Sequence, residues 1–449
     1  MAGLVTARAL REQGHDVIVL EASDRVGGQI HTVDWHGLRV DVGAEAMFLG
    51  GPHLKQLVND LGLTNNLVTP VRGSSWLYRD GTLTPLPEGV GPTGPTKLTP
   101  VLKSGLLSPL ALARAGLEPL LARRKVTEDI SVGAFITRRF GRAVAETFVD
   151  PLLGNLHAGD IDRLSLFSTA PQLAPLAREG RSLVWKKSTG KKAAAGSPNP
   201  VATPATSTST PVPAFASFAG GLQTLVNALA HDLVIKRLTP AKAARRTPHG
   251  WDITTPNGSI SAQRLVIAAP AAVAGRLLEA TVPGIGAELT TGPTADVATV
   301  LLAYPAAAAA GNTALTEANG ILLHSGSGRV LKAATFLSRK WAHLHSDEVF
   351  VVRASAGRAG SDVLDFVDDD TLADQIYREL AELIALRTRP VDTLVTRWPG
   401  AYPQLEVGHA SRLERIRTAL HDHPVHLVGA PYDGLGMPSV VKSAFVGAS

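Results

Sequence analysis

The stretch that decides the fold is the first 29 residues, MAGLVTARALREQGHDVIVLEASDRVGGQ. Apolar residues at helical spacing predict a helix over Ala2–Gln13 that ends at Gly14. The run HDVIVLEA (15–22) is almost continuously apolar, which is typical of a strand buried on both faces of a parallel sheet. An acid, Glu21, ends this strand, and a Gly-Gly turn follows it. This order is that of the second half of a dinucleotide-binding βαβ unit.

The spacing of this stretch suits a bound dinucleotide. In such a fold the pyrophosphate lies at the N-terminus of the first helix, where a G-x-G-x-x-G loop lets backbone N–H groups approach it. Gly3 stands at the place of the third glycine, and Glu21 follows 18 residues later. An acid near this spacing accepts hydrogen bonds from the adenosine ribose. Arg25 then supplies a cation near the phosphates, before the Gly27-Gly28 turn.

The first half of the βαβ unit is not found in the 449 residues. The missing part is one strand of roughly five or six residues and the first G-x-G, and Met1 fits the slot of an ordinary internal residue before Ala2. Our hypothesis is that the true start lies upstream of Met1. Without the missing strand, we expect the chain to bind the dinucleotide poorly or not to fold. An in-frame stop directly upstream, with no G-x-G codons before Met1, would rule this out.

The composition describes a folded protein of two or three domains. Of 449 residues, 45% are hydrophobic and 18% charged, which excludes a disordered chain. The absence of cysteine excludes disulfides and thiolate ligands, and no metal site is predicted. No apolar run reaches the roughly 20 residues that span a bilayer, so we expect a cytoplasmic protein. Although the sequence pI is about 9.4, no basic stripe with interleaved aromatics indicates a nucleic-acid partner.

Further elements follow along the chain. Residues 188–214 are low in complexity and rich in Pro, Ala, Ser and Thr, so a flexible insertion is predicted. RLVIAAP (264–270) and VHLVGA (425–430) read as buried strands. A helix is predicted over Leu372–Ile384, with Leu372, Ile376, Leu380, Leu383 and Ile384 on one face. A glycine-rich turn, YDGLGMPS (432–439), precedes the last helix, and Pro438 suits a first helical turn.

VLEASDRVGGQIHT (19–32) resembles the E-x-x-x-R-x-G-G signature of two-domain FAD oxidoreductases of the amine oxidase superfamily. The resemblance implies FAD as cofactor and a final helix whose N-terminus is aimed at the pyrimidine edge of the flavin. There the helix dipole stabilises the negative charge of the reduced ring, and Gly434 and Gly436 let the backbone approach it. The cofactor-binding residues implied in this way are Ala2, Gly3, Glu21, Ala22, Arg25, Gly27, Gly28, Gly43, Ala44, Gly429, Gly436, Met437 and Pro438.

Three further segments resemble the protoporphyrinogen/coproporphyrinogen oxidases within this superfamily. They are FVDPLLGNLHAGDIDRLSL (148–166), RWPGAYPQLEVGH (397–409) and LVGAPYDGLGMPSVVKSA (427–444). Amine oxidases usually carry a Gly-Glu pair after the last strand, whereas this chain has Gly429-Ala430. The three segments follow one another in the same order as in this family, so together they are more specific than any one of them.

The resemblance implies a Rossmann-like two-domain α/β FAD oxidoreductase fold with a mixed-sheet substrate domain and a helical subdomain. A discontinuous FAD-binding domain is expected from residues 1–75, 215–290 and 395–449, without its first strand. Residues 76–87 and 291–394 would form the substrate-binding domain. Residues 88–187 would form the helical subdomain, before the insertion at 188–214.

The activity implied is oxidation of a porphyrinogen, protoporphyrinogen IX or coproporphyrinogen III, to the porphyrin in heme biosynthesis, with O2 as acceptor. Positioning and enclosure are the main tasks of such a protein, so no catalytic residue is nominated. His157 and His409 fall in the matching segments but are expected to be structural. Arg72 and Arg79 are candidates to bind a substrate propionate. Whether the substrate carries two or four propionates stays open, as does the oligomeric state.

Two other functions fit the same signatures. A flavin amine oxidase or a carotenoid desaturase-type oxidoreductase shares the fold and the segment from Glu21 to Gly28. A non-catalytic truncated remnant would bind no flavin. Apart from these, the Leu-rich stretch 105–125, with Arg114, Arg123, Arg124 and Lys125, allows weak peripheral contact with the inner face of the membrane. Core packing with a solvated basic end is the expected role of these helices.

Overall fold

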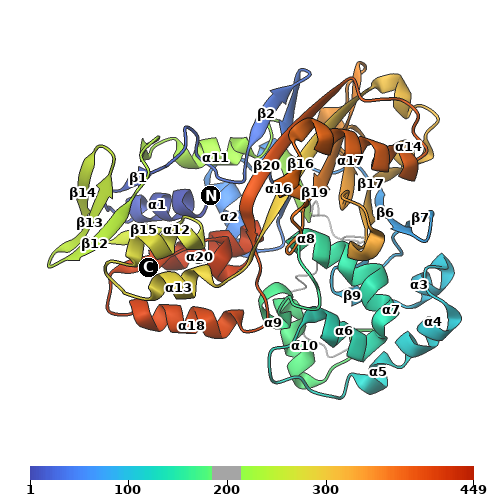
Figure 1. Cartoon of the computed structure of the whole chain (residues 1–449), viewed down its shortest axis with the longest axis horizontal. Coiled ribbons are helices and arrows are strands. Elements are labelled where there is room, and N and C mark those ends of the chain that lie inside the picture. Colours follow the sequence, from blue (N-terminus) through green and yellow to red (C-terminus); the bar gives the residue numbers. More distant parts are fainter. Residues whose placement is uncertain (185–213, 449) are drawn as a thin grey trace.

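The structure, a computed structural model, describes residues 1–184 and 214–448 (Figure 1). The predicted insertion 188–214 lies outside the described residues, apart from Ala214. In Figure 1 helices α1, α11, α12 and α20 gather at the left, a large sheet stands at the upper right, and helices α3–α10 lie below the sheet. Both ends of the chain lie in the left-hand part.

The left-hand part contains two pairs of parallel strands. β1 (Ile18–Leu20) pairs with β11 (Val234–Lys236), and β15 (Leu265–Ile267) pairs with β21 (Val425–Leu427). The prediction of a strand within 15–22 is confirmed, but its burial on both faces is wrong, because Ile18 is 43% exposed. Among the described residues β1 hydrogen-bonds to a strand on one side only, and this leaves its side chains less covered.

Helices bury the apolar side of these strands. The predicted N-terminal helix is α1 (Ala2–Glu12), which packs against α20 (Met437–Ala448) and α11 (Gln223–Ala230). Leu4 and Val5 of α1 share a core with Leu225 and Val441. A second core joins α12 (Ala271–Leu278), α13 (Ile285–Thr290) and α18 (His409–Leu420) to a meander of β12 (Ala243–Thr247), β13 (Gly250–Thr255) and β14 (Gly258–Ala262).

The large sheet has seven strands in the order β20-β16-β19-β18-β17-β6-β7. Only β17 and β6 run parallel, so the sheet is mixed, as the resemblance implies. The predicted helix is α17 (Asp369–Leu383), which buries Leu372, Ile376 and Leu380 against one face of the sheet. The strands are β20 (Asp392–Pro403), β16 (Thr294–Pro305), β19 (Val349–Ala356), β18 (Ala333–Phe336), β17 (Ala318–Leu323), β6 (Ser74–Arg79) and β7 (Thr82–Pro85).

The helices below the sheet form a separate core that contains a buried ion pair. Glu118 is 0% exposed and Arg139 is 2% exposed, and their Oε1 and Nη1 atoms lie 3.1 Å apart. The elements here include α3 (Thr99–Ser104), α4 (Pro109–Gly116), α5 (Glu118–Leu121), α6 (Val132–Phe140) and α8 (Asn155–His157). Residues Ala145–Gly154 form a π-helix, η2, a conformation that is frequent at functional sites.

One expected membrane-facing cation points elsewhere. The guanidinium of Arg114 donates to the carbonyl oxygens of Thr137, Arg138 and Arg139 at 2.9–3.1 Å, so it caps the C-terminal end of α6 and is not available to a membrane. Among the described residues, no helix combines the length and apolarity needed to cross a bilayer. The domain boundaries given above stay a prediction.

Candidate active site

The carboxylate of Glu21 lies at the end of β1, beside the start of α1. It is close enough to Met1 to favour the charged form of that amino group, although burial lowers the pKa of the amine to about 6. One carboxylate oxygen, Oε1, accepts hydrogen bonds from the backbone N–H of Ser23 at 2.9 Å and from its hydroxyl at 2.8 Å. These bonds hold the side chain and leave Oε2 to accept bonds from hydroxyls of a ligand. Ala22 follows, exposed.

The predicted glycine turn has backbone angles that favour glycine. Gly27 has φ +116° and Gly28 has φ +63°. A Cβ at Gly28 would meet nothing within 4 Å, so the turn presents bare backbone to open space. The guanidinium of Arg25 donates to the carbonyl oxygens of Gly28 at 2.8 Å and Ile30 at 3.2 Å. Arg25 therefore fixes the shape of the turn while keeping its charge beside it.

A second glycine segment crosses close to this turn. The N–H of Ala44 donates to the carbonyl oxygen of Gln29 at 3.0 Å, and a Cβ at Gly43 would lie 1.8 Å from that same oxygen. Only glycine allows this crossing. Ala44, Met1 and Met437 all pack against one hydrophobic core, and this core also contains Val26 and Ile30 on either side of the turn.

The last strand brings the C-terminal segment to the same place. Gly429 follows β21 with φ +119°, and a Cβ there would lie 3.6 Å from that of Ala2. A Cβ at Gly3 would lie 3.0 Å from that of Ala268, just after β15. Gly436 and Met437 lead into α20, with Pro438 in its first turn. Ala2, Gly3 and Gly429 therefore lie together at the N-terminus of α1. Gly436, Met437 and Pro438 lie at the N-terminus of α20, and the dipoles of both helices favour anions at these ends.

The residues present fit a flavin dinucleotide. Two helix N-termini and a bare glycine turn suit its phosphates, and Glu21 suits a ribose. The sequence did not reveal a group of charged side chains that lies beside Gly43 and Ala44. Glu45 is 11% exposed and forms ion pairs with Lys340 at 2.6 Å and Arg353 at 3.5 Å. Burial alone would raise the pKa of Glu45, but Lys340 and Arg353 outweigh it and the pKa is lowered.

Arg353 joins the large sheet to the glycine segment. Its Nη2 donates to the carbonyl oxygen of Gly43 at 2.5 Å. Because Arg353 lies on β19, this bond ties the face of the substrate sheet to the predicted flavin site. The sequence signal for this contact is an arginine inside the apolar stretch VFVVRASA (349–356).

The two arginines predicted to bind a propionate have no contact with Glu45, Arg353 or Gly43 among the described residues. Arg79 forms an ion pair with Asp80 at 3.2 Å and a hydrogen bond to the hydroxyl of Thr147 on η2. Arg72 lies exposed before β6, and its carbonyl oxygen accepts a bond from Arg339 at 3.2 Å. Substrate binding by Arg72 and Arg79 stays a prediction.

The two histidines are buried, as expected of structural residues. His157 is 6% exposed and His409 is 5% exposed. Burial lowers the pKa of each to about 4, helped at His409 by Arg412 and Arg417. Nδ1 of His409 lies 2.8 Å from Arg412 Nη2, whereas Nδ1 of His157 has no partner among the described residues. Both imidazoles are therefore neutral at pH 7.

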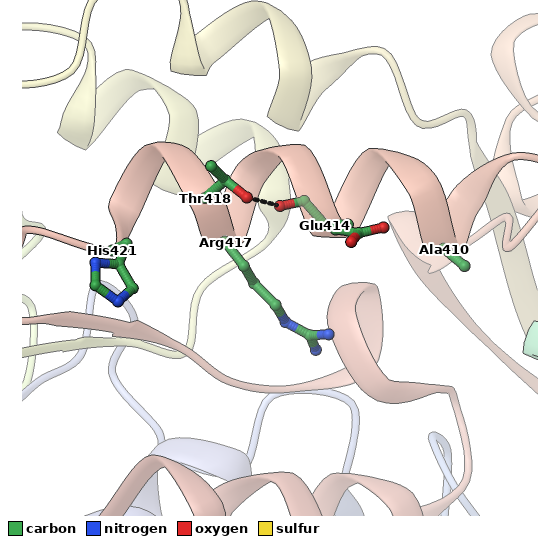
Figure 2. A pocket seen from close by; sticks show the side chains of 5 residues that line it. All are labelled: Ala410, Glu414, Arg417, Thr418 and His421. Atoms are coloured by element: carbon green, nitrogen blue, oxygen red, sulfur yellow. Dashed lines mark hydrogen bonds between the residues drawn. The ribbon is translucent and has the colours of Figure 1, made fainter.

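A hollow of about 470 Å³ lies along α18, lined by Ala410, Glu414, Arg417, Thr418 and His421. Figure 2 shows these side chains on one stretch of the helix, with the Thr418 hydroxyl bonded to the carbonyl oxygen of Glu414 at 2.9 Å. None of the predicted site residues lines it, and we assign it no ligand.

Comparison with known proteins agrees with this geometry. The family model for flavin containing amine oxidoreductases matches residues 1–448. The chain therefore belongs to the flavin containing amine oxidoreductase family, and its cofactor is FAD.

Individual similar proteins point to a narrower group than the family does. The chain is 31% identical over 434 residues to the coproporphyrinogen III oxidase of Bacillus subtilis (strain 168), covering 95% of this chain and 89% of the relative. It is 28% identical over 476 residues to the enzyme of the same name from Staphylococcus aureus, covering 100% and 96%. A crystal structure of a proposed protoporphyrinogen oxidase from Exiguobacterium sp. 255-15 superposes with a TM-score of 0.83 at 25% identity, covering 100% and 95%.

Proposed function

We propose that this protein oxidises a porphyrinogen to the porphyrin in heme biosynthesis, with O2 as electron acceptor. The observation that carries the proposal is the convergence of Glu21, the Gly27-Gly28 turn and the Gly429–Pro438 segment around two helix N-termini. Relatives named coproporphyrinogen III oxidase that align over nearly the whole chain support the substrate class.

The proposed roles of the residues follow from their contacts. Glu21 and Ala22 would bind the adenosine ribose, and Ala2 and Gly3 would face the pyrophosphate. Arg25, Gly27 and Gly28 would shape the turn beside the phosphates. The remaining members would face the flavin ring or its ribityl chain: Gly43, Ala44, Gly429, Gly436, Met437 and Pro438. When bound, FAD supplies the acceptor for hydride that leaves the substrate.

The overall reaction balances without a protein acid or base. Oxidation to the porphyrin removes six hydrogens from the macrocycle, and three molecules of O2 take them up as three molecules of H2O2. The protein positions the macrocycle and keeps water away from it. Neutral, buried His157 and His409 are consistent with this division of labour, since neither imidazole has an acid partner within the described part of the chain.

The test is an assay of the FAD-loaded protein with coproporphyrinogen III and with protoporphyrinogen IX in air. We expect the red fluorescence of a porphyrin to appear, with three H2O2 for each porphyrin formed. An amine oxidase would instead form H2O2 from amines and would oxidise neither porphyrinogen faster than air does in buffer without protein. A remnant without catalytic function would do neither.

We also propose weak peripheral contact with a membrane through the helical region. Four leucines on or beside α3–α5 are strongly exposed: Leu102 at 61%, Leu110 at 81%, Leu117 at 48% and Leu120 at 64%. Exposed Arg123, Arg124 and Lys125 follow them. Apolar side chains next to cations suit the surface of an anionic bilayer.

Sedimentation with phosphatidylglycerol vesicles tests this contact. We expect wild-type protein to bind, and Leu110→Asp/Leu120→Asp to bind at least about tenfold more weakly, since each leucine loses its burial in the lipid. Phe366→Asp is the matched control, because Phe366 is 80% exposed on α16 (Val363–Phe366), beside the sheet. Equal weakening by both changes, or no binding by wild type, would contradict the proposal.

A further inference from the structure

Three cations meet where the large sheet joins the helices. Lys332 precedes β18, Arg353 lies on β19, and Arg358 follows β19. The backbone N–H of Lys332 donates to the carbonyl oxygen of Ser355 at 2.9 Å, and Ser355 lies between the two arginines along the chain. Burial perturbs Lys332 most, and the positive charges of Arg358 and then Arg353 add to it. The helical side of the junction is formed by η2 and α8, and α8 lies between the sheet and the lower helices in Figure 1.

Several polar atoms of this junction have no partner. Lys332 is only 4% exposed, and its ammonium group forms no hydrogen bond or ion pair within residues 1–184 and 214–448. Nη1 of Arg358 and Nε of Arg353 are buried and have no acceptor among these same residues. Buried polar groups in native proteins almost always have partners, so two unsatisfied guanidinium donors beside an unpaired lysine indicate that a ligand supplies the acceptors.

The acids nearby are already engaged. Asp150 on η2 accepts the N–H of Ser325 at 2.6 Å and is the counter-charge of Arg358. Glu45 is shared by Lys340 and Arg353. Lys332 is therefore left without a counter-charge. A buried water could satisfy its hydrogen bonds but not its charge, and a buried unpaired ammonium is costly.

The backbone holds the cluster in place from both sides. The side-chain amide of Asn155 on α8 donates to the carbonyl oxygens of Leu323 at 2.9 Å and Lys332 at 3.1 Å. The N–H of Ala359 donates to the carbonyl oxygen of Ala158 at 2.7 Å. These bonds fix the start of β18 and the turn after β19 to α8, so the three cations form a preorganised group.

We propose that Lys332, together with Arg353 and Arg358, binds a carboxylate of the substrate. The inference rests on the proposed function, because a porphyrinogen carries its carboxylates on short propionate arms around an apolar ring. A carboxylate offers two oxygens as acceptors and the negative charge that the cluster lacks. Arg353 also donates to Gly43, so this site is joined directly to the predicted flavin site.

The experiment measures binding of the product, coproporphyrin III, to FAD-loaded protein by fluorescence. Lys332→Met should weaken binding by roughly ten- to a hundredfold, the effect of losing one hydrogen bond to a charged group. Lys242→Met is the matched control, because Lys242 is exposed and directly precedes β12, away from the cluster. The Lys242→Met variant should bind coproporphyrin III as wild type does. Binding of the uncharged tetramethyl ester should be the same in all three proteins.

Two further readouts separate this role from a structural one. Burial, then Arg358 and Arg353, lower the pKa of Lys332 to about 7, so at pH 8 most of the free lysine is neutral. Wild type should take up close to one proton when it binds the tetracarboxylate at pH 8, and Lys332→Met should take up none. Without ligand, Lys332→Met should be more stable than wild type at pH 6, because it removes a buried unpaired charge.

Unchanged affinity and proton uptake in Lys332→Met would overturn the inference. Lys332→Gln repeats the test with a side chain that is polar but uncharged. If neither variant folds, wild type alone decides, since equal affinity for coproporphyrin and its ester, with no proton uptake, would also overturn it. If wild type neither binds coproporphyrin nor oxidises coproporphyrinogen, the proposed function itself fails.

Discussion

Two adjacent glycines allow the account of the flavin turn to be tested by a matched pair of substitutions. Gly27 has φ +116°, and a Cβ there would lie 2.8 Å from the carbonyl oxygen of Ile30 and 3.2 Å from a methyl of Val226 on α11. Gly28 has φ +63° and open space around it. Gly28→Ala should therefore cost about 1 kcal/mol, the penalty of the left-handed region. Gly27→Ala should cost about 3–5 kcal/mol, because a strained angle and overpacking add.

The assay is urea denaturation of FAD-free wild type, Gly27→Ala and Gly28→Ala, followed by circular dichroism. The affinity of each folded protein for FAD is then measured by flavin fluorescence. We expect Gly27→Ala to lose much more unfolding free energy and FAD affinity than Gly28→Ala. Equal losses in the two variants, or a larger loss in Gly28→Ala, would refute the reasoning from Cβ contacts.

Three other predictions concern buried ionisable groups, each measured as the free energy of unfolding. Arg139→Met leaves the carboxylate of Glu118 buried and unpaired, which should cost about 3–5 kcal/mol; adding Glu118→Met should restore most of this, and a double variant less stable than the single one would contradict it. Burial raises the pKa of Asp41 to about 7, against the bonds from Thr32 and Leu222 that lower it. The stability this gives is present below about pH 4 and is lost as the pH rises to 7, by about 4 kcal/mol, so Asp41→Asn should abolish that loss; an unchanged pH profile would count against it. Burial lowers the pKa of His157 to about 4, so stability should be lost as the pH falls from 6.5 to 4, by about 3 kcal/mol; His157→Gln should resist this acid loss, and equal acid sensitivity would argue for an exposed imidazole.

The sequence alone predicted those parts of the fold and site that depend on a short local pattern of residues. The spacing of apolar residues predicted α1 and α17, and the acid after a short apolar strand predicted the position of Glu21. Glycines with positive φ at Gly27, Gly28 and Gly434 fit the turns that the sequence predicted. Each of these features depends on residues within about one helix or one turn.

Features that depend on packing between distant segments could not be predicted. Lys332 is the one charged residue in the stretch VLKAATF (330–336), and what makes it unusual is its burial beside Arg358. Arg114 reads as one of a cluster of surface cations, but in the structure it caps α6, 23–25 residues further along the chain. The exposure of Ile18 follows from which strands pair with β1, which its own sequence does not contain.

The central claim is that the start of the chain and the glycine turn before its last helix enclose one FAD. The most direct measurement is titration of purified wild type, Glu21→Ala and Glu12→Ala with FAD, followed by flavin fluorescence. Glu12 ends α1 and pairs with Arg8 at 2.8 Å, so it is the matched control. We predict that wild type and Glu12→Ala bind alike and that Glu21→Ala binds at least about tenfold more weakly, having lost charge-assisted bonds to the ribose. Equal FAD affinity in wild type and Glu21→Ala would contradict the account.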